Sequence, residues 1–162
     1  PMRWLLVDKI DVLVSGETAQ GRKAWPADSA FFADHFPKFP VVPGVLLMEA
    51  LAQLAGKLIG YTVRQTRGDW PFPILSMMNG VKFRKFVRPD EEVILMTRLT
   101  SIREDMAVVQ SRAKCGGRVV AQAEQIFVFN AVPLDNDQDA ATLERLERAE
   151  MKRLWADYPE DE

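Results

Sequence analysis

A long apolar segment constrains the fold of this chain more than any other feature. Residues 44–65 are rich in leucine, alanine and methionine, and Pro43 precedes them, where a proline removes no intrahelical hydrogen bond. The segment therefore predicts a helix of about 33 Å. Its apolar residues lie on nearly every side, so other structure must cover it. Glu49, Gln53 and Lys57 argue against a membrane-spanning helix.

Strand-like segments with short connections are available to cover this helix. Two precede it and four follow it, at residues 4–14, 18–25, 74–87, 92–102, 106–114 and 118–130. The connections at 103–105 and 115–117 have hairpin length, which predicts an antiparallel meander. Residues 26–43 contain four prolines and are expected to form an ordered loop. One helix and about six strands predict an α+β fold with the sheet wrapped around the helix.

The end of the chain differs from the rest in charge. Residues 1–133 hold 17 Lys/Arg against 13 Asp/Glu, whereas residues 134–162 hold 4 against 10. Residues 140–156 favour an amphipathic helix with an i,i+4 pair of Glu144 and Arg148. Its apolar stripe consists of Leu143, Leu146, Met151, Leu154 and Trp155. We predict one domain over 1–133 and an acidic helical extension over 134–162 whose stripe packs on the body or on a neighbouring subunit.

Composition disfavours several classes of protein. The single cysteine, Cys115, cannot form an internal disulfide, and neither a signal pattern nor an uninterrupted apolar run of membrane-spanning length is present. We therefore expect a cytoplasmic protein without a membrane span. The mildly basic body lacks a dense Lys/Arg run, which argues against nucleic-acid binding. No metal and no cofactor are expected.

The chemistry is concentrated in residues 35–53, HFPKFPVVPGVLLMEALAQ. This segment resembles the signature of the β-hydroxyacyl-acyl-carrier-protein dehydratases. Each signature position carries the family's residue type: His35, Phe36, Pro37, Pro40, Pro43, Gly44, Val45, Glu49 and Gln53. The resemblance extends over roughly residues 4–130, through LLVDKI, VKFRKFVRPDEE and GRVVAQAEQIF. It implies a single hot-dog domain and a hydro-lyase of fatty-acid or related lipid biosynthesis.

The residues of this segment suit that chemistry. Dehydration of a 3-hydroxyacyl thioester needs a base, an acid and a donor to the thioester oxygen. His35 is the candidate base, because histidine titrates near neutrality. Glu49 is the candidate acid, because an apolar helix favours its protonated form. Gly44 and Val45 begin the helix, where unpaired amides can polarise the carbonyl, and Gln53 can orient Glu49 from one turn away.

The resemblance also implies partners. The acyl chain would arrive on the phosphopantetheine of acyl carrier protein or on coenzyme A. Lys82, Arg84, Lys85 and Arg88 are candidates for docking the acidic carrier protein, although they can equally be a solvated face. The family forms at least homodimers, including trimers of dimers, with tunnels at the seam. We therefore expect His35 of one subunit to face Glu49 of the other.

Two positions depart from the family pattern, and two alternative functions are compatible with the sequence. Asp34 stands where the family usually has glycine, and Phe86 stands where it usually has proline, so both bear on substrate choice. The fold by itself does not fix the reaction, so an acyl thioesterase of the same fold is an alternative. A non-catalytic acyl-binding or regulatory protein is another. The complete dehydratase signature argues against the thioesterase, and retention of both His35 and Glu49 argues against the non-catalytic protein.

Overall fold

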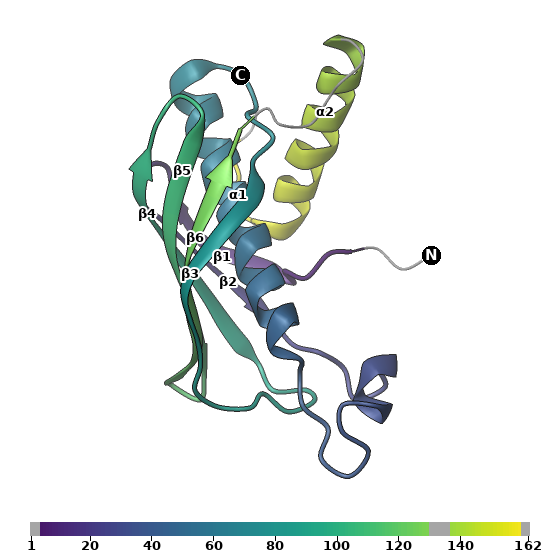
Figure 1. Cartoon of the computed structure of the whole chain (residues 1–162). Helices are drawn as coiled ribbons and strands as arrows, with labels where there is room; N and C mark the ends of the chain where they lie inside the picture. Colours follow the sequence, from purple (N-terminus) through teal and green to yellow (C-terminus); the bar gives the residue numbers. More distant parts are fainter. Residues whose placement is uncertain (1–3, 130–136, 160–162) are drawn as a thin grey trace.

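The computed structural model describes residues 4–129 and 137–159, and its centre is helix α1 (Gly44–Arg67). The helix begins at the predicted residue and ends at Gly68, whose φ of 87° suits a glycine at a helix end. A six-stranded antiparallel sheet curves around α1 (Figure 1). The predicted α+β architecture of a sheet wrapped around one long helix is therefore confirmed.

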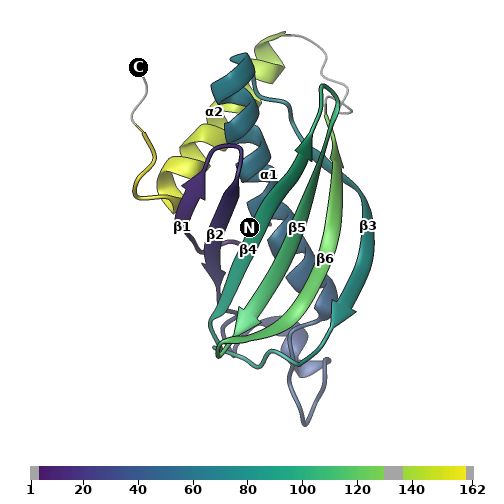
Figure 2. The ribbon, with the colours of Figure 1, turned by 90° about the vertical axis from the view of Figure 1, so that its left-hand side faces the viewer.

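Six strands among the described residues correspond to the six predicted segments, although the first begins five residues later than predicted and the third ends four residues earlier. They are β1 (Lys9–Val14), β2 (Thr18–Lys23), β3 (Ile74–Phe83), β4 (Val93–Ile102), β5 (Met106–Cys115) and β6 (Arg118–Val128). Their order in the sheet is β1-β2-β4-β5-β6-β3, as Figure 2 shows. Strands β4, β5 and β6 form the predicted meander, and Gly116 and Gly117 turn the last hairpin with φ of 58° and 79°.

The place of β3 corrects the prediction of one continuous meander. This strand pairs with β6 and lies at the edge of the sheet, not beside β4. The connection from β3 to β4 is longer than the hairpin turns and contains Pro89. It therefore crosses from one edge of the sheet to the interior, and one side of β3 is paired with no strand of the described residues.

Burial explains why α1 is apolar on so many sides. Leu51, Leu54 and Leu58 have no exposed surface, and Val93 and Leu95 of β4 close over the helix. By length and composition α1 could cross a membrane, but 61% of its most apolar stretch is buried inside the fold. Its composition is therefore that of a core helix enclosed by a sheet.

The proline-rich loop contains one feature that the sequence did not predict. Residues Ala30–Ala33 form a short 3₁₀ helix, η1, supported by hydrogen bonds from Phe32 N to Ser29 O and from Asp34 N to Phe31 O. Backbone hydrogen bonds also tie the loop to the body, with Val42 N 2.8 Å from Val87 O. The loop projects beyond the N-terminal end of α1 (Figure 1).

The predicted terminal helix is present as α2 (Asp137–Leu154) and packs beside α1 (Figure 1). Met151, Leu154 and Trp155 are buried, and the Trp155 ring meets Tyr61 edge-on at 5.3 Å. The first half of the predicted stripe is instead exposed, to 37% at Leu143 and 59% at Leu146. Only the second half of the stripe meets the body. The predicted domain boundary at residues 133 and 134 lies outside the described residues.

A glycine of α1 offers a test of this packing. A Cβ at Gly60 would lie 2.3 Å from Trp70 Cζ2, whereas a Cβ at Gly56 would have only Pro73 Cγ, at 4.0 Å. We expect Gly60→Ala to lower the free energy of unfolding by about 1–2 kcal/mol, because overpacking outweighs alanine's better helix propensity. Gly56→Ala is the control and should be neutral or stabilising. Urea denaturation of both variants measures the difference, and equal stabilities would contradict the close packing of Trp70.

Candidate active site

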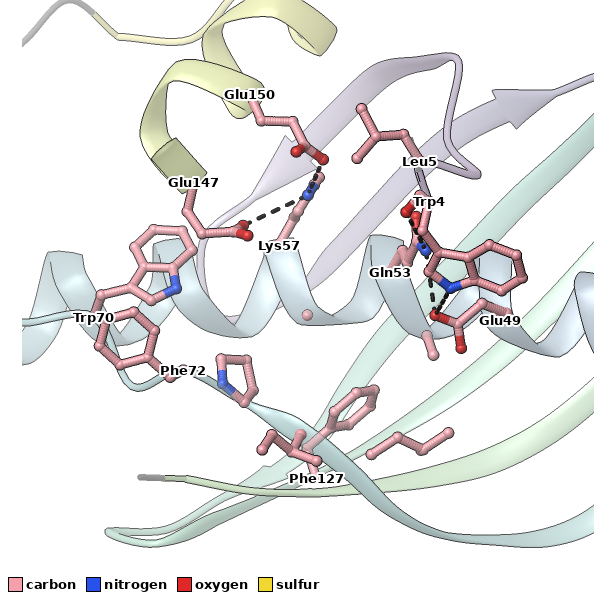
Figure 3. Close-up of a pocket in the computed structure, with 15 residues that line it drawn as sticks. Trp4, Leu5, Glu49, Gln53, Lys57, Trp70, Phe72, Phe127, Glu147 and Glu150 are labelled. Carbon is pink, nitrogen blue, oxygen red and sulfur yellow. Dashed lines mark hydrogen bonds and ion pairs between the residues drawn. The ribbon is translucent and has the colours of Figure 1, made fainter. Parts of the chain in front are cut away.

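The carboxyl group of Glu49 lies on the second turn of α1 and is partly buried. Its Oε1 atom accepts hydrogen bonds from Trp4 Nε1 at 3.0 Å and from Gln53 Nε2 at 3.2 Å (Figure 3). Within residues 4–129 and 137–159, both of the hydrogen bonds to this carboxyl group end on Oε1. The Oε2 atom makes neither contact and is therefore the carboxyl oxygen available to a ligand.

Gln53 holds the N-terminal segment beside Glu49. Its Oε1 atom accepts a hydrogen bond from Leu6 N at 2.7 Å, and its Nε2 atom donates to Trp4 O at 3.0 Å. Trp4 is the site residue that the sequence analysis missed. No spacing rule indicates it, because 45 residues separate it from Glu49 and only the fold brings them together.

His35 is held on the loop that follows η1. Its Nδ1 atom lies 3.3 Å from Val41 O, and its backbone oxygen accepts from Val41 N at 2.9 Å. Because a carbonyl oxygen can only accept, this contact puts the ring proton on Nδ1. In the neutral ring this arrangement leaves the lone pair on Nε2, which is the form that a general base requires.

Gly44 and Val45 form the start of α1. Among the described residues, the first amide of this turn with a hydrogen-bond partner is that of Leu46, which donates to Pro43 O at 2.9 Å. The amides before it are available to a ligand oxygen. Packing also favours glycine here, because a Cβ at Gly44 would lie 2.6 Å from Cε1 of the Phe83 ring, which would have to move.

A cavity of about 640 Å³ runs along α1 from Glu49. Glu49 and Gln53 lie at one end and Trp70 and Phe72 at the other, with Phe127 on the opposite wall (Figure 3). His35, Gly44 and Val45 are not among its lining residues. One chain thus brings Glu49 and Gln53 together with Trp4 and leaves His35 on a loop outside the cavity.

The four basic residues predicted to dock a carrier protein are all exposed. The Nε atom of Arg88 donates a hydrogen bond to Pro40 O at 2.9 Å, and its Cζ atom lies 4.2 Å from the centre of the Phe39 ring. Arg88 therefore supports the proline-rich loop. Arg84 donates to Gln122 Oε1 at 3.3 Å. Lys82 and Lys85 present their ammonium groups to solvent. Docking by these residues stays a prediction.

The two positions that depart from the family pattern are also at the surface. Asp34 ends η1 and is exposed. Phe86 is 66% exposed, and its ring meets Phe39 edge-on at 5.6 Å. Phe86 therefore extends the aromatic surface of the loop that carries His35.

Cys115 is a poor candidate for nucleophilic catalysis. Burial raises the pKa of the Cys115 thiol, and the nearby Glu91 carboxylate raises it further. Such a thiol is a poor nucleophile at neutral pH. Within residues 4–129 and 137–159, no three His, Cys, Asp or Glu side chains are grouped to hold a metal ion.

Comparison with known proteins settles the family. The FabA-like domain family matches this chain over residues 1–124. The chain belongs to this family. Among FabA-like relatives, it is 38% identical to the 3-hydroxyacyl-[acyl-carrier-protein] dehydratase FabZ of Caldanaerobacter subterraneus subsp. tengcongensis over 126 residues, covering 78% of this chain and 87% of the relative. It is 41% identical over 126 residues to the FabZ of Clostridium botulinum strain Loch Maree, covering 78% and 85%.

Solved structures agree on the fold of this FabA-like chain. The dehydratase heterocomplex ApeI:P from Xenorhabdus doucetiae matches with a TM-score of 0.63 at 15% identity, over 86% of this chain and 89% of the other. The smu.793 protein of Streptococcus mutans, bound to acetyl CoA, matches with a TM-score of 0.61 at 10% identity, over 80% and 93%. At these identities the likeness shows a hot-dog fold and nothing about the reaction.

Proposed function

We propose that this chain is a 3-hydroxyacyl-[acyl-carrier-protein] dehydratase, a hydro-lyase that forms a trans-2-enoyl thioester in fatty-acid or related lipid biosynthesis. The observation that carries the proposal is the position of Glu49, whose Oε2 atom is available at the end of a cavity suited to an acyl chain. Family membership and relatives that carry this activity in their names support it. A cytoplasmic location is part of the proposal.

The chain's own residues supply each proton transfer, and no cofactor takes part. The Nε2 atom of His35 removes a proton from C2 of the substrate, and negative charge grows on the thioester oxygen. The amides of Gly44 and Val45 stabilise this charge at the helix N-terminus. Protonated Glu49 gives its proton to the C3 hydroxyl, which leaves as water while the C2–C3 double bond forms. Hydration of the enoyl thioester reverses these steps.

A complete site requires a second copy of the chain. Within one chain His35 does not line the cavity that holds Glu49. Strand β3 has an unpaired edge, and its exposed apolar side chains are Ile74, Met77, Met78, Val81 and Phe83. An apolar unpaired edge of this kind is typically covered by a partner. We therefore infer a homodimer with two shared sites, which can assemble further into a trimer of dimers.

One assay separates this proposal from its alternatives. The purified protein is incubated with crotonyl and 3-hydroxybutyryl thioesters of acyl carrier protein and of coenzyme A. Absorbance follows the double bond, and a thiol reagent follows hydrolysis. A dehydratase interconverts the two thioesters without releasing thiol. Thiol release would indicate a thioesterase, and binding without either change would indicate a non-catalytic acyl-binding protein. Comparison of the two carriers shows which one the protein uses.

The Trp4 contact predicts a smaller effect on the same reaction. Trp4→Phe keeps an aromatic ring but removes the donor to Glu49 Oε1, so the carboxyl group is less well oriented. We expect kcat to fall about 5- to 10-fold with KM little changed, as is typical for loss of one hydrogen bond to a reacting group. Trp25→Phe is the matched control, because the buried Trp25 indole has no hydrogen-bond partner among residues 4–129 and 137–159. An unchanged kcat in Trp4→Phe would show that this hydrogen bond does not position Glu49.

A further inference from the structure

The cavity that begins at Glu49 reaches a charged cluster built from two helices. Lys57 of α1 places its Nζ atom 2.7 Å from Glu150 Oε1 and 3.6 Å from Glu147 Oε2, both of α2 (Figure 3). The Lys57 side chain is only 7% exposed. All three residues line the same cavity as Glu49.

The path from Glu49 to this cluster suits an acyl chain. Glu49, Gln53 and Lys57 follow one another at intervals of four residues, so they share a face of α1 and span about 12 Å along its axis. Ala52 and Gly56 lie between them and leave space beside the helix. The opposite wall is apolar. Its residues include Phe72, Leu75 and Phe127.

The docking of α2 beside α1 does not by itself explain the charged cluster of Lys57, Glu147 and Glu150. The helix is already held by buried Met151, Leu154 and Trp155. A separate ion pair, Arg64 Nε to Glu144 Oε1 at 2.9 Å, joins α1 and α2 away from the cavity. Replacing a buried ion pair by apolar side chains of similar volume is often neutral or stabilising, so docking alone does not require these charges. Beyond Glu49 and Gln53 the rest of the cavity lining is apolar, so a buried lysine with two carboxylates at its wall calls for another explanation.

We propose that Lys57, Glu147 and Glu150, which line the cavity wall between Glu49 and the Trp70 end, form a charged end stop that sets the longest acyl chain this enzyme accepts. The inference rests on the proposed dehydratase function. Each methylene buried in the apolar part of the cavity strengthens binding by roughly fourfold. A chain that reaches the end stop must instead remove water from the charges or separate them, which is unfavourable. The substrates are then short- and medium-chain 3-hydroxyacyl thioesters, and α2, which lies beyond residues 1–124 matched by the family, takes part in selecting them.

The test compares chain-length profiles of the full chain. The value of kcat/KM is measured with four-, eight-, twelve- and sixteen-carbon 3-hydroxyacyl thioesters of acyl carrier protein and of coenzyme A. For the unmodified protein we expect kcat/KM to rise and then fall at the longer chains. In Lys57→Met/Glu147→Leu/Glu150→Leu the ratio of sixteen-carbon to eight-carbon kcat/KM should rise at least tenfold, because two further buried methylenes account for such a change.

A matched control separates the end stop from helix docking. Arg64→Met/Glu144→Leu removes the other ion pair between α1 and α2 and should leave the profile unchanged. An equal shift in this control would show that docking of α2, and not the charged cluster, sets the chain length. An unchanged profile in the triple variant would also overturn the proposal. Absence of turnover with every thioester would disprove the dehydratase function itself, which is a different result.

A second variant keeps the test decisive if the triple variant fails to fold. Gly56→Leu fills the cavity before the end stop, and leucine has the better helix propensity. We expect it to lower the ratio of eight-carbon to four-carbon kcat/KM at least tenfold. An unchanged ratio would mean that the acyl chain does not run along α1 toward Lys57, and the end stop would then be wrong.

Discussion

Glu49→Gln is expected to lower kcat/KM for dehydration and for hydration by about 10²- to 10⁴-fold. The amide is nearly the same shape and can still accept a hydrogen bond from Trp4, so the site keeps its geometry. It cannot give a proton to the leaving hydroxyl group. His35→Ala removes the base and should cause a loss of similar size. Absorbance of the enoyl thioester measures both variants.

Stability measurements separate lost chemistry from lost fold. Urea denaturation of both variants should give midpoints close to that of the unmodified protein, because neither side chain is fully buried. Glu104→Gln is the matched control, since Glu104 is an exposed glutamate in the turn between β4 and β5 and should leave turnover unchanged. Turnover within tenfold of normal in either site variant would be incompatible with the assigned roles.

Mixing the two inactive variants is expected to restore activity, which is the second large effect. If His35 of one subunit completes the site of its partner, a mixed dimer of His35→Ala and Glu49→Gln chains has one site with both residues intact. Random exchange of equal amounts makes half of the dimers mixed, so activity should return to roughly one quarter of normal. The recovery exceeds the residual rate of either variant by at least tenfold.

Recovery of activity in the mixture can be interpreted only if the two variants exchange subunits, so exchange is measured separately. Chains labelled with different isotopes show mixed dimers by native mass spectrometry. A mixture of His35→Ala with the double variant His35→Ala/Glu49→Gln is the control, because no site in it regains His35. If mixed dimers form and activity does not return, both residues act within one subunit, and the exposed edge of β3 has another role.

Patterns of residues close together in the sequence predicted the central helix, the β4–β6 meander and the family. The composition of residues 44–65 required a helix enclosed by other structure, and α1 begins at the predicted Gly44. The short turns required the β4–β6 meander, because hairpin connections leave few other pairings. The signature from His35 to Gln53 pointed to the family because its spacing depends on one loop and one helix start. These inferences rest on residues close together in the chain.

Tertiary structure alone decided the remaining features. It placed β3 beside β6, since the connection from β3 to β4 is long enough to allow either edge. It brought Trp4 to Glu49 across 45 residues, and Glu147 and Glu150 to Lys57. A charged or aromatic side chain has many possible partners in a sequence, and its actual partner depends on how whole elements pack. The pattern of α2 predicted an apolar stripe, yet only the packing against Tyr61 and β1 left Leu146 in solvent and buried Trp155.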